Sequence, residues 1–260
     1  MATGARIHAE ERGRVTILTL SNPAKRNALN PSLLEQLADE LERLARAPAQ
    51  IVVLRGEGER VFSSGYDIGA IRGGAGEEAS RHPLGRALEA IESFPFPIVA
   101  MVFGGAYGAA CELVASCDLR FASDDARFAI PAGRLGVVYA AEGVARLARG
   151  ASPALVRELL YTARPIDAPR ALSLGLVQGL HPRAALEAEV LALAGEMAGL
   201  APRTLSGAKR MLAALARRNQ LTAAELEEFA RLRDEALSSI DFAEGQAAFA
   251  AKRAPRFTGR

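Results

Sequence analysis

The feature that most constrains this chain is an apolar run that turns at glycines into an apolar helix. Residues 98–103 are apolar without interruption, which predicts a short buried strand. Gly104, Gly105 and Gly108 then indicate a turn, and from Ala109 the pattern becomes helical and almost wholly apolar. We therefore expect a strand, a glycine-rich turn and a buried helix at the centre of the fold.

One charged residue, Glu112, lies inside this apolar helix. A buried carboxylate without a partner is costly, so its presence needs a reason. Helical spacing puts only small residues on its face: Gly108 and Ala109 one turn before it, Ala115 and Ser116 one turn after. We interpret the gap beside the carboxylate as room for a ligand. A structural glutamate held in a salt bridge is the alternative.

The start of the same helix supplies a second polar group. The first N–H groups of a helix have no partner within it, and the helix dipole is positive at that end. The N–H of Ala109 lies one turn from Glu112 on the same face. The stretch therefore predicts an oxyanion donor and a carboxylate facing one small cavity.

The composition fits one large domain, with room for an appendage, in a chain of 260 residues. The net charge is only +2 with acids and bases interspersed, which argues against nucleic-acid and membrane surfaces. No apolar segment indicates a signal peptide, so we expect a cytoplasmic protein. The two cysteines, Cys111 and Cys117, suit core thiols, and the three scattered histidines predict no metal site.

Strand and helix patterns alternate through the first 150 residues, which predicts an α/β core with crossover connections. We expect a hairpin over 6–20, strands at 51–54, 98–103, 119–122 and 127–130, and a brief extended piece at 176–177. The expected helices are 31–46 with Asn30 as its cap, 83–93, one from Ala109, and others beginning near Glu142, Pro153 and 168.

Two further regions stand out from this alternation. Residues 72–82 are rich in glycine and charge without periodicity, which favours a mobile lid. The last part of the chain has no strand pattern, and possible capping boxes at 222–225 and 241–244 predict late helices. We place the boundary between a core of residues 1–195 and a helical region of residues 196–260.

Four segments in order, 22–28, 62–68, 104–118 and 128–136, together resemble the crotonase superfamily, the enoyl-CoA hydratase/isomerase family. The resemblance covers nearly the whole chain and ends in the family-like segment 248–253. It implies an α/β spiral of ββα units and a C-terminal helical region used to form a homotrimer, or a hexamer from two trimers. It also implies an acyl-CoA thioester as substrate, and no cofactor beyond the CoA moiety.

The resemblance assigns roles to particular residues. Two backbone N–H groups would polarise the thioester carbonyl and stabilise the enolate, and by position these belong to Tyr66 and Ala109. Loss of one such donor typically costs about 2.7–4 kcal/mol of transition-state stabilisation. The positions that correspond to CoA contacts are Lys25, Arg26, Ala28, Ser64, Asp67, Ile68 and Lys252. Lys25 and Arg26 would meet phosphates; a solvated loop is the alternative for this pair.

The chain departs from the family pattern at one catalytic position. Family hydratases carry two glutamates: one corresponds to Glu112, whereas the other is replaced here by Ala132. Water addition needs a proton removed from water and another delivered to carbon, which suits two carboxylates. Tyr139, in the following loop, could bind an acyl carboxylate or relay a proton, or it could simply pack with its hydroxyl at the surface. Glu142 more plausibly stabilises a helix start.

Methylmalonyl-CoA decarboxylase-like members share this combination of one glutamate with a tyrosine at the position of Tyr139. They differ in having histidine at the position of Tyr66. Decarboxylation forms the enolate directly and needs no base, so we favour it for a short malonyl-type thioester. Hydration or isomerisation with Glu112 alone is the first alternative, and a non-catalytic CoA-binding protein the second. A dinucleotide-binding oxidoreductase is disfavoured because the glycine spacing differs from Gly-x-Gly-x-x-Gly.

Overall fold

The computed structural model describes most of the 260 residues, and the fold is reported for these alone. The described residues are 4–48, 50–67, 69, 82–134, 139–218, 224, 227–228, 231, 235, 238–251, 253 and 255–260. Ile68 and Lys252, both expected to contact CoA, lie outside them. So do the first late capping box (Thr222 and Glu225) and all of the expected lid except His82.

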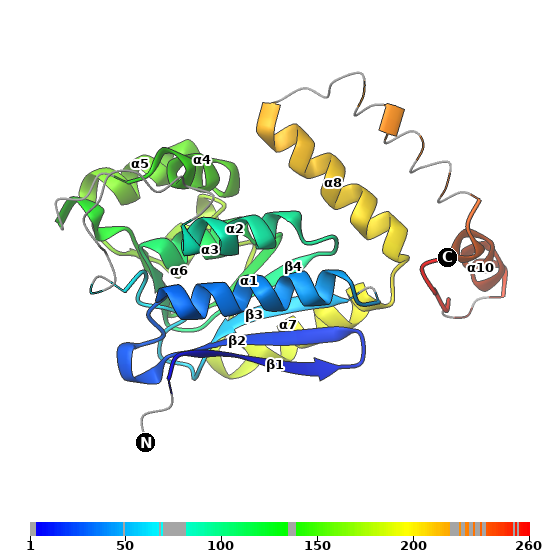
Figure 1. The fold of residues 1–260 in the computed structure, drawn as a ribbon, viewed down its shortest axis with the longest axis horizontal. Coiled ribbons are helices and arrows are strands. Elements are labelled where there is room, and N and C mark those ends of the chain that lie inside the picture. Colours follow the sequence, from blue (N-terminus) through cyan, green and yellow to red (C-terminus); the bar gives the residue numbers. More distant parts are fainter. Residues whose placement is uncertain are drawn as a thin grey trace.

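A six-stranded sheet forms the centre of the molecule (Figure 1). Its order is β1-β2-β3-β4-β6-β9, in which β1 and β2 form the expected antiparallel hairpin and all later neighbours are parallel. The strands are β1 Arg6–Arg12, β2 Val15–Ser21, β3 Ile51–Gly56, β4 Ile98–Val102, β6 Leu119–Ser123 and β9 Gly179–His181. Parallel strands of this kind require the crossover connections that the alternating pattern predicted.

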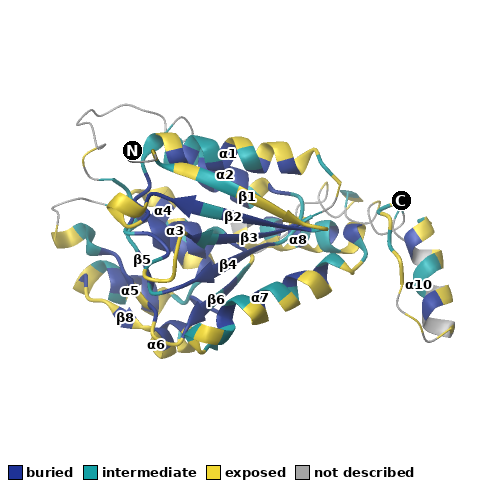
Figure 2. Ribbon diagram, turned by 90° about the horizontal axis from the view of Figure 1, so that it is seen from below, coloured by how far each residue is buried: buried dark blue, intermediate teal, exposed yellow. Residues whose placement is uncertain are grey.

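Helices cover both faces of this sheet, as Figures 1 and 2 show. Helices α1 (Pro31–Ala45) and α2 (Pro83–Ser93) lie on one face, and α7 (Arg183–Ala198) contacts β3, β4 and β6 on the other. Successive side chains of β3 point to opposite faces: Val52 joins the core on the α1 and α2 side, and Val53 joins the core under α7. An apolar run without alternation therefore suits a strand that is buried on both faces.

The glycine-rich turn leads into a second, smaller sheet of order β5-β7-β8. Its strands are β5 Gly105–Tyr107, β7 Arg127–Ala129 and β8 Ile166–Asp167, and around it lie α3 Ala109–Ser116, α4 Ala141–Gly150, α5 Pro153–Thr162 and α6 Ala168–Ser173. The sequence analysis missed β5 and β8 because two- and three-residue strands carry no period. The brief extended piece expected at 176–177 is buried and lies just before the strand β9.

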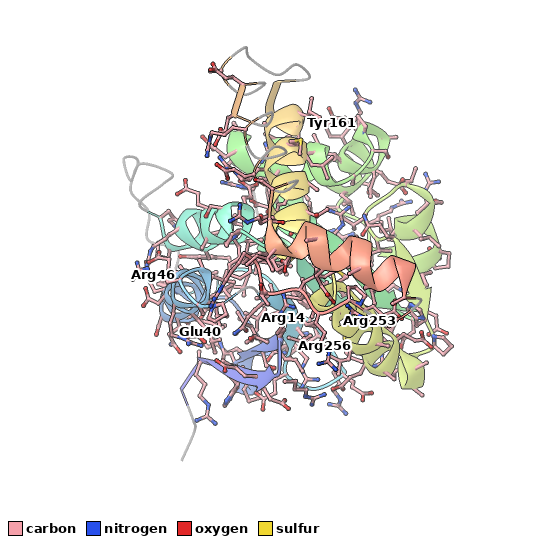
Figure 3. All side chains as sticks on the ribbon, turned by 90° about the vertical axis from the view of Figure 1, so that its right-hand side faces the viewer. Arg14, Glu40, Arg46, Tyr161, Arg253 and Arg256 are labelled. Carbon is pink, nitrogen blue, oxygen red and sulfur yellow. The ribbon has the colours of Figure 1, made fainter. Side chains whose placement is uncertain are left out.

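The C-terminal region contains α8 (Pro202–Arg218) and α10 (Ile240–Ala250). The expected capping box at 241–244 is wrong, because Asp241 lies inside α10 and its carboxylate accepts the N–H groups of Thr258 and Gly259. Glu244 likewise accepts the N–H of Arg256 and pairs with Arg253. Figure 3 shows Arg253 and Arg256 beside this helix. Both acids therefore hold the C-terminal tail against α10.

Candidate active site

Glu112 lies in the middle of α3 and is only 5% exposed. No Lys, Arg or His among the described residues lies within ion-pair distance of its carboxylate, so the salt-bridge alternative is wrong for this part of the chain. Burial raises the pKa of the carboxyl above its ordinary 4.5, and the Tyr139 hydroxyl and the Arg146 guanidinium offset this only in part. A carboxyl with a raised pKa can hold a proton and deliver it.

Tyr139 approaches the same point from the loop that precedes α4. Its hydroxyl is buried, so the alternative of a surface hydroxyl is wrong. Burial and the negative charge of Glu112 raise the pKa of the phenol, which therefore keeps its proton. The two groups act on each other electrostatically, although no hydrogen bond of good geometry joins them in this structure. Tyr139 thus provides a protonated donor beside the carboxyl.

Gly143, on the first turn of α4, makes this arrangement possible. A Cβ atom at this position would lie 2.7 Å from Glu112 Oε1 and 2.8 Å from Tyr139 Cε1. Seven residues later Gly150 approaches Ala115 in the same way, with its would-be Cβ 2.7 Å from the Ala115 carbonyl oxygen. The two glycines let α4 lie close against α3. Sequence reasoning missed Gly143, although its place in a predicted helix just after Tyr139 was visible.

The two expected oxyanion donors lie on neighbouring segments. Leu29 N–H donates to the Gly65 carbonyl and Asp67 N–H donates to the Leu29 carbonyl, both at 2.9 Å. Because neighbouring peptide groups of an extended segment point to opposite sides, the N–H of Tyr66 points away from Leu29. The Cβ position of the neighbouring Gly65 lies 3.7 Å from the backbone nitrogen of Ala109.

The conformation of Gly65 depends on its being glycine. Its φ is +95°, and a Cβ atom there would lie 2.5 Å from the Tyr107 carbonyl oxygen. As the first residue of α3, Ala109 has no partner for its N–H within the helix. The structure therefore brings the segments of Tyr66 and Ala109 together at the N-terminus of the helix that carries Glu112.

Four of the expected CoA contacts cluster on two loops that are bonded to each other. Lys25 Nζ lies 2.7 Å from Asp67 Oδ2, and Ser64 Oγ donates to the Lys25 carbonyl at 3.0 Å. The N–H of Ser64 donates to the Arg26 carbonyl at 3.0 Å. The hydrogen bond from Lys25 holds the pKa of Asp67 below its usual value. The Lys25 side chain is exposed and can reach a ligand.

Asn27, which sequence reasoning did not select, holds this loop in place. It is 1% exposed and has a positive φ of 54°, a conformation that asparagine tolerates better than most residues. Its amide nitrogen donates to the carbonyls of Glu57 and Val61. The expected contact Ala28 is also buried, and its carbonyl accepts the amide of Asn22. The indication of Asn27 that the sequence offered was an asparagine in a predicted loop.

The position of the missing glutamate is close to the core. Ala132 lies in a short 3-10 helix, Pro131–Arg134, and packs against the main core while partly exposed. Glu142 is exposed in the first turn of α4, as a helix-stabilising acid would be, and its charge raises the pKa of Glu112. Glu112 is therefore the buried carboxylate of this cluster within the described residues.

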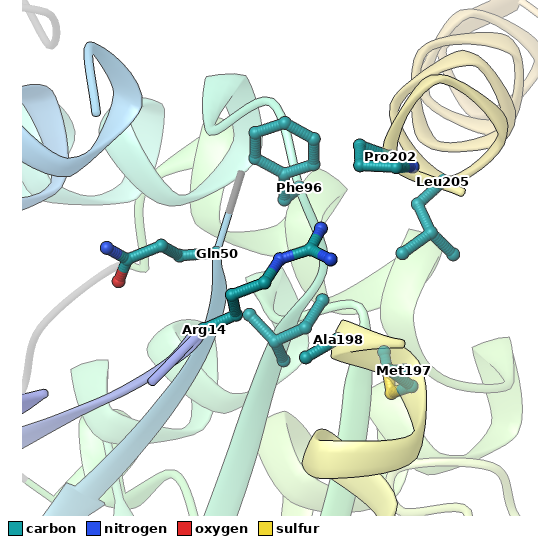
Figure 4. Close-up of a pocket in the computed structure, with 8 residues that line it drawn as sticks. Arg14, Gln50, Phe96, Met197, Ala198, Pro202 and Leu205 are labelled. Atoms are coloured by element: carbon teal, nitrogen blue, oxygen red, sulfur yellow. The ribbon is translucent and has the colours of Figure 1, made fainter. Parts of the chain in front are cut away.

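Two cavities among the described residues are lined by residues other than Glu112 and Tyr139. The small cavity in Figure 4, about 10 Å³ and lined by Arg14 and Phe96 among others, holds no more than one water molecule. A larger cavity of about 610 Å³ lies between the C-terminal end of α3 and α8.

Within the described residues, no group of His, Cys, Asp and Glu could hold a metal ion. In the same part of the chain no helix is long and apolar enough to cross a bilayer.

One family model matches almost the full length of the chain. The model described as Enoyl-CoA hydratase/isomerase matches residues 10–260. The chain belongs to the enoyl-CoA hydratase/isomerase family. The α/β fold and the crotonase resemblance predicted from four short segments are therefore confirmed.

Relatives of this family member carry different activities in their names. The methylmalonyl-CoA decarboxylase of Escherichia coli (strain K12) is 33% identical over 248 residues, which is 95% of each chain. A probable enoyl-CoA hydratase of Bacillus subtilis (strain 168) is 36% identical over 252 residues, 94% of this chain and 95% of the relative. Because the identities to both kinds of enzyme are similar, they show the family but do not distinguish between the two reactions.

Solved structures of family members agree with the fold. An enoyl-CoA hydratase/carnithine racemase from Magnetospirillum magneticum superposes with a TM-score of 0.90 at 33% identity, covering 98% of this chain and 96% of its own. A methylmalonyl CoA decarboxylase complexed with 2S-carboxypropyl CoA superposes with a TM-score of 0.78 at 31% identity over 100% of both chains.

Proposed function

We propose that this family member binds a short malonyl-type acyl-CoA and decarboxylates it through a stabilised enolate. The observation that supports the proposal is the buried carboxyl of Glu112 beside the buried hydroxyl of Tyr139, with no other buried carboxyl in this cluster among the described residues and Ala132 at the position of a second carboxylate. This set lacks the pair of carboxylates that water addition uses. It retains a proton donor and two candidate oxyanion donors.

The reaction follows from the proposed placement of these groups. The bond between the α-carbon and the free carboxylate breaks, and its electron pair moves into the thioester as an enolate while CO2 leaves. The N–H groups of Tyr66 and Ala109 stabilise the negative oxygen, each by about 2.7–4 kcal/mol. The α-carbon then takes a proton from Tyr139, whose raised pKa keeps it protonated, or from Glu112, whose pKa burial raises above its ordinary value.

The CoA moiety would bind on the two bonded loops. In this proposal the exposed Lys25 and its neighbour Arg26 meet phosphate groups, and Ala28, Ser64, Asp67, Ile68 and Lys252 are the other contacts. The ion pair with Asp67 would hold the Lys25 side chain in place before the ligand binds, and a phosphate of the ligand would then also pair with the Lys25 ammonium. Lys25→Ala should accordingly raise KM and leave kcat nearly unchanged.

A mass-spectrometric screen of acyl-CoA thioesters tests the reaction. Methylmalonyl-, ethylmalonyl-, malonyl- and crotonyl-CoA are incubated with the protein, and CO2 release and product masses are followed. We expect loss of CO2 from at least one diacid thioester, reduced in Glu112→Gln and Tyr139→Phe. Tyr161→Phe is the control, because Tyr161 is 81% exposed on α5. Hydration of crotonyl-CoA at an ordinary enzymatic rate without CO2 release would exclude decarboxylation.

Hydration or isomerisation with Glu112 alone is the second candidate, favoured by relatives named as hydratases. The same screen distinguishes it, because hydration adds the mass of one water to crotonyl-CoA. Unchanged behaviour of Glu112→Gln on every thioester tried would favour a non-catalytic CoA-binding protein instead.

The assembly and location expected from the resemblance are also proposals. We propose that the core of residues 1–195 binds the acyl-CoA and that the helical region 196–260 forms a homotrimer, or a hexamer of two trimers, in the cytoplasm. Light scattering of the purified chain measures the particle mass. A monomer at working concentration would exclude the trimer.

A further inference from the structure

His82 uses both of its ring nitrogens in the structure. It precedes α2 as the N-cap residue, and its Nδ1 accepts the backbone N–H of Leu84 at 3.3 Å. Its Nε2 lies 3.4 Å from the hydroxyl oxygen of Tyr66, and the two ring centroids are 5.3 Å apart. One imidazole therefore joins the start of α2 to the segment that carries a proposed oxyanion donor.

The contact with Leu84 fixes the tautomer of the neutral ring. A nitrogen that accepts an N–H cannot carry a proton itself, so the neutral imidazole of His82 holds its proton on Nε2. That N–H then donates to the hydroxyl oxygen of Tyr66. The direction of the bond follows from the helix cap, and a cap substitute that cannot reach Tyr66 would break it.

The helix behind His82 is firmly held. Arg86, one turn further along α2, pairs with Asp39 at 2.7 Å and with Glu42 at 2.8 Å on α1, and also with Glu35. The opposite face of α2 is buried in the main core through Ala87, Leu88 and Ile91. The imidazole thus precedes a helix that is tied to α1 by ion pairs and to the core by buried side chains.

The backbone holds the segment of Tyr66 from its other side. The hydrogen bonds of Leu29 to Gly65 and Asp67 restrain the peptide groups on both sides of Tyr66. The preceding Gly65 has a positive φ, so rotation about this residue would turn the Tyr66 N–H. The contact between the Tyr66 hydroxyl and His82 adds a hold on the same segment through the side chain.

We propose that His82 is a positioning residue, which holds the Tyr66 hydroxyl and thereby aims the Tyr66 N–H at the thioester oxygen. This inference rests on the proposed function, because it assumes that this N–H is an oxyanion donor. At this position the backbone N–H is the proposed oxyanion donor, and the tyrosine side chain has a separate role. Its hydroxyl connects the segment of Tyr66 to α2 through His82. The effect passes through orientation and leaves CoA binding unchanged.

Two substitutions separate the contact between His82 and the Tyr66 hydroxyl, called the clamp below, from the helix cap. His82→Asn keeps a favoured N-cap side chain but is too short to hold the Tyr66 hydroxyl. Tyr66→Phe keeps the ring and removes the hydroxyl. We expect each to lower kcat about threefold to tenfold, the worth of about one hydrogen bond, with KM little changed. The double variant should be no slower than the slower single one, because both break the same contact.

A vibrational measurement separates orientation from general damage. Propionyl-CoA labelled with ¹³C at the thioester carbonyl is bound to each variant, and the carbonyl stretch is recorded by difference infrared spectroscopy. The wild type and the control Tyr161→Phe should lower the frequency relative to free ligand, and both clamp variants should lower it less. Circular dichroism confirms that each variant is folded, and Tyr66→Phe alone suffices if His82→Asn unfolds.

The outcomes distinguish a failure of the proposed function from a failure of the positioning role of His82. If wild-type protein leaves the carbonyl frequency unchanged, the oxyanion site and the proposed function fail. If the wild type lowers the frequency and the folded clamp variants lower it equally, the function stands and the positioning role of His82 is overturned.

Discussion

Gly143 lies so close to Glu112 that a single methyl group on it would come within 2.7 Å of the carboxylate. The same methyl would be 2.8 Å from the ring of Tyr139. One missing side chain on α4 therefore lets a carboxyl on α3 and a phenol from the preceding loop share one small space. The proposed proton donors depend on this gap as much as on their own identities.

Gly143→Ala should force Glu112 or Tyr139 to move. We expect a loss of stability of about 1–3 kcal/mol from overpacking, and a fall in kcat larger than any change in KM. Gly195→Ala is the matched control: Gly195 also lies in a helix, α7, but a Cβ atom there has nothing within 4 Å. The control should gain up to about 1 kcal/mol. Urea unfolding and steady-state kinetics measure both, and equal behaviour of the two variants would contradict the packing argument.

Glu112→Gln should change the pH dependence of stability. Burial raises the pKa of this carboxyl above 4.5, so the folded protein holds the proton more tightly than the unfolded chain. The wild type therefore loses stability as the pH rises from about the unfolded value through the raised one, and the loss is complete above it. Glutamine does not ionise, so the variant should be the more stable at neutral pH relative to acid. Urea midpoints across this range test it; parallel curves would show that Glu112 is not buried as an acid.

The sequence was informative where burial or chemistry leaves a pattern. The apolar run at 98–103 and the helix from Ala109 were predicted within a residue or two, because a strand and a helix buried on all sides are apolar throughout. Asn30 was recognised as a cap because its side chain has one job there, accepting the Leu33 N–H at 2.8 Å.

The rest depends on contacts between segments far apart in the chain. Nothing in the local pattern shows that Gly143 faces Glu112 or that the ring of His82 reaches Tyr66, because both depend on how α2 and α4 pack. Asp241 was mistaken for a cap because an acid at a helix start is usually one, whereas here the returning tail offers better donors. Residue identity predicted the chemistry of the site, and tertiary packing decided its partners.

Asp241→Ala should release the C-terminal tail. The buried carboxylate accepts the N–H groups of Thr258 at 2.6 Å and Gly259 at 2.7 Å, and no other side chain is shown to do so. We expect these two amides to exchange hydrogen much faster in the variant, with α8 unaffected. Asp241→Asn keeps one acceptor oxygen and should be intermediate. Hydrogen-exchange mass spectrometry of the last residues measures the change. Unaltered protection in the alanine variant would show that Asp241 does not hold the tail.

Acid should loosen the same tail in the wild type. The hydrogen bond from Arg253 holds the pKa of Glu244 at about 2, below its ordinary 4.5. A lowered pKa means that the stabilising contribution is complete above 4.5 and is lost as the pH falls toward 2. Hydrogen exchange at the Arg256 amide, which donates to Glu244 at 2.7 Å, should therefore rise over this window once the intrinsic pH effect is divided out. Glu244→Gln should remove the pH dependence.

Lys209 attaches the helical region to the core, and its loss should be costly. It is 9% exposed on α8, and its ammonium donates to Asp118 at 2.7 Å and to the carbonyls of Ile91 and Phe96. Lys209→Met keeps the length of the side chain and leaves Asp118 without its cation, which should cost about 2–4 kcal/mol. The neighbouring Arg210 pairs with Glu228 at the surface, so Arg210→Met should cost less than about 1 kcal/mol. Urea unfolding of both variants gives the comparison, and a similar small cost for each would show that α8 is held by apolar packing instead.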